Sequence, residues 1–118
     1  MIVDDDDRFV RVVSELLVRD GFHVVGAARD RTQGLGLITD VSPEVAIVDL
    51  HLGQGSGIEL IADIVRAGLA ARVFLVLVSS CAEDDLREVF MLSAADGYLP
   101  KLDLSAGAIR HMLGQNGS

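Results

Sequence analysis

Acidic, hydroxyl and lysine side chains occur in this sequence at points where short apolar runs end. Four such positions stand out, namely the acidic run 4–7, Asp49, Ser79 and Lys101. Short runs rich in Val and Ile are typical of strands buried on both faces of a parallel sheet. Because ligands of open α/β sheets bind outside the carboxyl ends of the strands, we expect the four positions to meet at one edge.

The chemistry of such a cluster follows from its charges. Neighbouring carboxylates repel one another, and they are tolerated only around a cation or with protons retained. A set of oxygen ligands suits Mg²⁺, or Mn²⁺, with water completing the shell. Lys101 adds a fixed positive charge and Ser79 a hydroxyl donor, so the cluster has the groups needed to hold a phosphoryl group. Taken singly, each residue also has an ordinary structural explanation, and it is their joint placement that favours a phosphoryl site.

Strands and helices must alternate to position these residues. The hydrophobic pattern predicts strands at 1–3, 22–27, 45–50, 73–78 and 98–99, and helices at 8–19, 30–39, 58–65, 83–94 and 105–113. We expect Asp30 and Ser105 to cap their helices, and residues 114–118 to form a polar tail. The alternation predicts an α/β fold, a doubly wound parallel sheet of five strands flanked by five helices.

The composition of the chain limits the classes of function that it can have. The chain has 118 residues, half of them hydrophobic, a net charge of −8 and one cysteine. This predicts a single domain over 1–118, disfavours nucleic-acid binding by that domain alone, and fits a reducing compartment. Without a signal peptide or a long apolar stretch, we expect a cytoplasmic protein that does not contact the membrane. The first strand is either very short or begins upstream of this sequence.

The site residues occur in a familiar order. Asp4 and Asp5, then Asp49, Ser79, Tyr98 and Lys101, with 22 residues from Ser79 to Lys101 and Gly57 eight places after Asp49, resemble the receiver domain of two-component response regulators. The resemblance covers essentially the whole chain. It implies the flavodoxin-like strand order 2-1-3-4-5.

The resemblance implies a role for each position of the phosphoryl site. Asp49 would accept a phosphoryl group from a sensor histidine kinase. Asp4, Asp5, Asp49 and the backbone carbonyl of His51 would hold Mg²⁺, and Lys101 would pair with a phosphoryl oxygen. The protein would then be a phosphorylated switch and not a turnover enzyme.

Other positions would transmit or time the signal. The resemblance implies that Ser79 moves toward the phosphoryl group and that Tyr98 rotates inward, changing the face formed by the last two helices. His51 and Cys81 would flank the path of the hydrolytic water. Neither readily orients that water, so we expect slow self-dephosphorylation.

The chain departs from the family pattern at two points. Gly53 replaces the usual proline of the loop after Asp49, and we expect a more mobile loop. Leu102 follows Lys101 where proline, with a cis bond, is common. We expect a trans bond between Lys101 and Leu102, because a cis bond there would cost about 3 kcal/mol.

Alternatives remain for function and output. A small phosphohydrolase with Asp49 as nucleophile would need an acid two residues later, where this chain has His51. A receiver that acts only through protein–protein interaction is a further possibility. We expect an effector domain outside this sequence, the route by which such a protein would bind DNA, with a stand-alone receiver as the alternative. A homodimer through the last-helix face, or through a pair formed by the first and last helices, is also expected.

Overall fold

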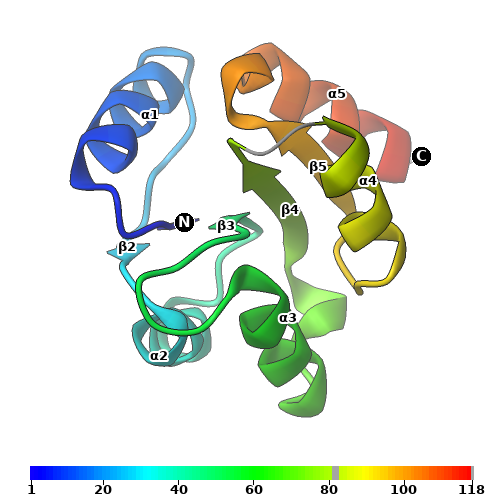
Figure 1. Ribbon diagram of the computed structural model, residues 1–118. Helices are drawn as coiled ribbons and strands as arrows, with labels where there is room; N and C mark the ends of the chain where they lie inside the picture. Colours follow the sequence, from blue (N-terminus) through cyan, green and yellow to red (C-terminus); the bar gives the residue numbers. More distant parts are fainter. Residues whose placement is uncertain (81–82, 118) are drawn as a thin grey trace.

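The computed structural model describes residues 1–80 and 83–117, and all their side chains except those of 83, 84 and 115–117. Five strands of the described chain form one parallel sheet in the order β2-β1-β3-β4-β5 (Figure 1). They are β1 (Ile2–Val3), β2 (Ala27–Ala28), β3 (Val45–Asp49), β4 (Phe74–Ser79) and β5 (Gly97–Pro100). The predicted fold class and strand order are confirmed.

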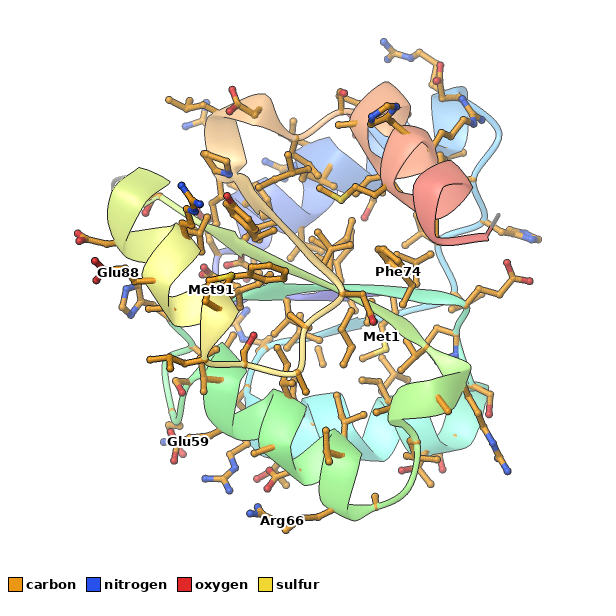
Figure 2. The ribbon with its side chains drawn as sticks, turned by 90° about the vertical axis from the view of Figure 1, so that its right-hand side faces the viewer. Met1, Glu59, Arg66, Phe74, Glu88 and Met91 are labelled. Atoms are coloured by element: carbon orange, nitrogen blue, oxygen red, sulfur yellow. The ribbon has the colours of Figure 1, made fainter. Side chains whose placement is uncertain are left out.

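Helices cover both faces of this sheet. They are α1 (Asp7–Arg19), α2 (Arg31–Val41), α3 (Gly57–Arg66), α4 (Glu83–Met91) and α5 (Ala106–Gly117), with short 3₁₀ turns η1 (Ala70–Arg72) and η2 (Lys101–Asp103). Figure 2 shows the sheet between two layers, with α1 and α5 above it and α2 and α3 below. The predicted caps form, since Asp30 accepts a hydrogen bond from the Gln33 backbone and Ser105 from that of Ala108.

The core consists of two apolar layers on either side of the sheet. Successive side chains of a strand point to opposite faces. Val48 and Leu77 therefore pack in the layer that includes α2, α3 and α4, whereas Ile47 and Val76 pack in the layer that includes α1 and α5. Every residue of β4 is buried. The two strands that carry Asp49 and Ser79 are thus held rigidly from both sides.

The second strand is much shorter than predicted. The sequence pattern places a strand at 22–27, yet β2 contains only Ala27–Ala28. Its neighbour β1 offers only Ile2 and Val3 for pairing. Phe22 and Val24 are instead half-buried against the layer of α1 and α5, so their hydrophobicity reflects packing and not ladder hydrogen bonds.

Two helix ends also differ from the prediction. Helix α4 ends at Met91 and not near Ala94, because the Ser93 hydroxyl donates to the carbonyl of Phe90 and competes with further helical bonds. Helix α5 continues through Gly117, where a polar tail is predicted from Gly114 onward. An interior glycine weakens a helix but does not end it unless it turns left-handed, and Gly114 has no positive φ.

No helix within the described ranges combines the length and the apolar character needed to cross a lipid bilayer.

Candidate phosphoryl-transfer site

Strand register brings two carboxylates side by side at the carboxyl edge of the sheet. Val3 of β1 pairs with Val48 of β3, so Asp4 and Asp49 each come next after a paired residue. The backbone N–H of Asp4 donates to the carbonyl of Ala28, which ties the end of β1 to β2. Asp4 is 1 % exposed and Asp49 is 6 % exposed. Two nearly buried carboxylates therefore occupy this edge.

The residues of the acidic run 4–7 have two different roles, helix capping and formation of the site. Asp6 is the N-cap of α1 and accepts hydrogen bonds from the backbone N–H groups of Arg8 and Phe9 at 3.0 and 3.3 Å. The Oδ1 of Asp4 accepts a hydrogen bond of 2.8 Å from the Asp6 backbone. Asp7 pairs with the guanidinium of Arg29. The Oδ2 of Asp4 is turned toward the site, where it pairs with Lys101.

A close approach of α3 to β3 explains the glycine eight residues after Asp49. A Cβ atom at Gly57 would lie 2.2 Å from the backbone oxygen of Asp49, far inside van der Waals contact. The Gly57 N–H donates to the carbonyl of Leu50 at 2.9 Å. Gly57 thus lets the helix begin directly behind the strand end that carries the nucleophile candidate.

The loop between β3 and α3 also approaches the acidic cluster. A bridge between His51 and Ser56 closes the loop. A Cβ atom at Gly53 would lie 3.0 Å from the Oδ2 of Asp5, at the limit of tolerable contact. The missing side chain at Gly53 therefore leaves room for the Asp5 carboxylate. The greater mobility expected of this loop stays a prediction.

Lys101 reaches the cluster from the other side. Its Nζ lies 2.8 Å from the Oδ2 of Asp4 and 3.3 Å from the Oδ2 of Asp49, and its side chain is 17 % exposed. The peptide bond to Leu102 is trans, as predicted. Lys101 begins the η2 turn directly after β5, so no cis bond is needed for its ammonium to reach Asp49.

Burial and the charges of these groups shift the pKa values of Asp49 and Lys101. Burial, followed by the charge of Asp4, raises the pKa of Asp49, although Lys101 and the His51 backbone N–H favour the ionised carboxylate. Burial by itself would lower the pKa of Lys101, but the contacts with Asp4 and Asp49 outweigh it and the pKa is raised. The lysine therefore remains an ammonium, while the Asp49 carboxylate lacks sufficient positive charge around it.

The donor set fits a divalent cation. Carboxylate oxygens of Asp4, Asp5 and Asp49 all lie within 4.8 Å of one another. Oxygen-only ligands match the preference of Mg²⁺. The raised pKa of Asp49 indicates that Lys101 alone does not balance the charge of the three carboxylates. These residues together fit a hard cation such as Mg²⁺ or Mn²⁺.

The remaining predicted residues lie on β4, on β5 and in the loop after β3. Ser79 is fully buried at the end of β4, where it pairs in register with Pro100. Tyr98 is half-buried in β5, and its ring centroid lies 4.7 Å from that of Phe90. His51 is exposed and donates its backbone N–H to the Asp49 carboxylate. Cys81 lies outside the described residues, so its role remains a prediction.

The sequence pattern did not identify Phe9 as part of the site. Its helical spacing in 8–19 indicates a core residue, and it does pack against the layer of α1 and α5. The centroid of its ring, however, lies 4.2 Å from the Nζ of Lys101. No local signal links two residues so far apart in the sequence, so only the fold reveals this contact.

Known proteins resemble the chain over nearly its whole length. Residues 1–113 match the family described as the response regulator receiver domain. The chain is 35% identical over 104 residues to the nitrate/nitrite response regulator protein NarP of Escherichia coli, covering 86% of this chain and 46% of NarP. It thus spans about half the length of the nitrate/nitrite regulators that it matches.

Solved structures agree with this match. The signal receiver domain of the putative response regulator NarL from Mycobacterium tuberculosis has a TM-score of 0.80 and 26% identity, with 93% of this chain and 90% of that chain covered. A response regulator from Burkholderia pseudomallei, solved with a phosphorylated aspartic acid, calcium ion and citrate, has a TM-score of 0.80 and 28% identity. The match covers 98% of this chain and 65% of that one.

Proposed function

The chain belongs to the family of response regulator receiver domains, the signalling domains of two-component systems, and we propose that Asp49 is its phosphoacceptor. The observation that carries the proposal is the meeting of Asp49 with Lys101 and with two further carboxylates at one edge of the sheet. A bare cluster of carboxylates would be unfavourable, whereas a cluster with one ammonium and room for a cation suits a transferring phosphoryl group.

The reaction is a transfer of a phosphoryl group from a phosphohistidine of a sensor kinase. A carboxylate oxygen of Asp49 attacks phosphorus, the P–N bond breaks, and the imidazole leaves with the bonding electrons and takes up a proton. Lys101 stands 3.3 Å from the Asp49 carboxylate and balances the charge of a phosphoryl oxygen. The backbone N–H of His51 donates to the same carboxylate and fixes its orientation.

Asp4, Asp5 and Asp49, with the backbone carbonyl of His51, are the proposed ligands of Mg²⁺ or Mn²⁺. The bound cation would neutralise the phosphoryl oxygens. Asp4 would be the most rigid ligand, because its Oδ1 is held by the Asp6 backbone. Asp5 is exposed and would adjust its carboxylate to the cation.

The signal would leave the site through Ser79 and Tyr98. Ser79, buried at the end of β4, would donate its hydroxyl to a phosphoryl oxygen. Tyr98 packs on Phe90 of α4, so a turn of its ring inward would release that contact and alter the surface of α4 and β5. His51 and Cys81 would tune the lifetime of the phosphorylated state, which we expect to be long.

The output would lie beyond this domain. The chain spans about half of the nitrate/nitrite regulators it matches, and we propose a longer cytoplasmic regulator whose effector domain binds DNA. The α5 face is the proposed surface for a homodimer.

Incubation with acetyl phosphate and Mg²⁺, followed by intact mass measurement, tests the proposal. The protein should gain one phosphoryl group, and the Asp49→Asn variant should gain none. Asp63→Asn, which removes a carboxylate from the surface of α3, is the matched control and should be labelled normally. Catalytic release of phosphate from a phosphomonoester, or labelling that survives Asp49→Asn, would overturn the proposal.

A further inference from the structure

Within the described residues, three groups lie around the ammonium of Lys101. The carboxylates of Asp4 and Asp49 lie 2.8 and 3.3 Å from its Nζ, and the ring centroid of Phe9 lies 4.2 Å from it. Phe9 comes from the first turn of α1, whereas Lys101 follows β5, at the opposite end of the sequence. The contact therefore joins two elements that meet only in the folded protein.

The backbone around Lys101 does not by itself determine the position of its long side chain, so neighbouring groups must do so. Lys101 begins a short 3₁₀ turn, and the next residue, Leu102, is 99 % exposed. A lysine stem has four rotatable bonds, and its ammonium is a compact charge without a preferred direction. Contacts with the Lys101 head group must therefore decide where the charge is held.

The ring of Phe9 supplies an attraction that the carboxylates do not. The face of an aromatic ring carries partial negative charge and attracts an ammonium within about 6 Å. The Lys101 side chain is only 17 % exposed, so little water competes for this contact. The ring is also uncharged, so it holds the ammonium without adding a fourth negative charge to the site.

We propose that Phe9 is a positioning residue that holds the Lys101 ammonium at the distance from Asp49 that phosphoryl transfer requires. This inference rests on the proposed function of Asp49. Removing the aromatic face would let the ammonium move toward Asp4 or solvent, and phosphorylation would slow although both charged partners remain.

The molecule contains a matched control contact. Arg110 of α5 lies over the ring of Phe22, with 4.8 Å between the guanidinium carbon and the ring centroid. Arg110 also pairs with Asp20, so this second cation–π contact lies at the end of α1 away from Phe9. Phe22→Leu removes an aromatic ring from the same apolar layer without touching Lys101.

The test compares a graded series of aromatic rings at position 9 in the whole chain. Phe9→Leu should slow phosphorylation by acetyl phosphate and weaken beryllofluoride binding roughly two- to tenfold. Phe9→Tyr should restore both, and Phe22→Leu should change neither. Replacing Phe9 by mono-, di- and trifluorophenylalanine, which reduces the negative charge of the ring face at nearly constant size, should lower both quantities stepwise.

The outcomes separate this inference from the proposed function. If the unaltered protein is not phosphorylated, the assignment of Asp49 fails. If it is phosphorylated and the fluorinated series leaves rate and affinity unchanged, Phe9 only fills space and the positioning role is refuted. Circular dichroism of each variant identifies any loss of folding, and the fluorinated series still decides if Phe9→Leu does not fold.

Discussion

Two clusters of charged side chains in this molecule contrast sharply. The acidic site combines three carboxylates, those of Asp4, Asp5 and Asp49, with the single ammonium of Lys101. The helix-face network joins two guanidinium groups to two carboxylates across α2 and α3, and its members are Arg31, Glu59, Asp63 and Arg66. Figure 2 shows Glu59 and Arg66 on the outer side of α3.

The geometry and the pKa shifts of the two clusters reflect their different burial and charge balance. Arg31 forms a bidentate ion pair with Asp63, with N–O distances of 2.6 and 2.9 Å. This pairing, with help from Arg66, lowers the pKa of Asp63 to about 2. At the acidic site, burial and the charge of Asp4 raise the pKa of Asp49. The anionic form of an aspartate is thus stabilised at Asp63 and destabilised at Asp49.

The contrast indicates different purposes. A balanced network satisfies its own charges and serves to join α2 to α3. An unbalanced, mostly buried site should lower the stability of the domain in the absence of a cation, and we expect a cation to restore that stability. The predictions below test this distinction with variants that change one cluster or its immediate surroundings.

Cation binding should give the largest difference. Mg²⁺ at about one hundred times its Kd should stabilise the unaltered protein by about 2.7 kcal/mol. Asp5→Asn should lose most of that gain, whereas Asp63→Asn, which changes the net charge equally, should keep it. Thermal unfolding with and without Mg²⁺ measures both, and an equal loss in the two variants would mean that the cation acts only on overall charge.

Without a cation, substitutions in the acidic site and in the helix-face network should change the Tm in opposite directions. Asp49→Asn relieves the repulsion with Asp4, and we expect Tm to rise by a few degrees. Asp63→Asn leaves Arg31 and Arg66 with fewer partners, so Tm should fall by a smaller amount. Thermal unfolding in chelator at low salt gives both values. A fall in Tm for Asp49→Asn would show that its contact with Lys101 outweighs the repulsion.

The loop glycine should have a smaller effect on cation binding. Gly53→Ala would press on the Oδ2 of Asp5 and turn that carboxylate away from Asp4 and Asp49, so Mg²⁺ affinity should fall several-fold by calorimetry. Gly36→Ala in α2 is the control, because its new Cβ would meet nothing within 4 Å. Unchanged affinity in Gly53→Ala would mean that the loop yields instead of Asp5.

Much of this fold follows from local patterns. The buried runs at β3 and β4 are continuous and rich in Val, Leu and Ile, so their strand character and the position of Asp49 are predictable. The caps Asp30 and Ser105 are equally local signals. These features predicted the parallel sheet and the edge at which the site residues lie.

Features that depend on a distant partner were not predictable. Residues 22–26 have strand propensity, but strand formation requires a paired neighbour and β1 is only two residues long. Gly34 appears unfavourable for α2, yet a Cβ there would lie 2.7 Å from a methyl carbon of Leu60, so the glycine permits α2 and α3 to pack closely. The contact of Phe9 with Lys101 depends in the same way on where α1 and β5 meet.

The smallest expected effect is the pH dependence of the helix-face network. The folded pKa of Asp63 is about 2, below the value of about 3.9 for an unfolded chain. A depressed pKa contributes stability that is fully present above the unfolded value and is lost as the pH falls through the folded one. The Tm difference between the unaltered protein and Asp63→Asn should therefore be constant above about pH 5 and shrink toward pH 2.

Asp49 should show the opposite relation, since its folded pKa is raised. Its ionisation destabilises the fold, so the gain in Tm from Asp49→Asn should be complete only above the folded pKa and disappear as the pH falls through the unfolded value. Salt separates the clusters further, because screening weakens the exposed contacts of Arg66 and Glu59 more than those of the buried Asp4. Carboxyl NMR titration of both residues checks the two directions. Raised pKa values at both would show that burial outweighs the arginine contacts of Asp63, and lowered values at both would show that Lys101 outweighs burial at Asp49.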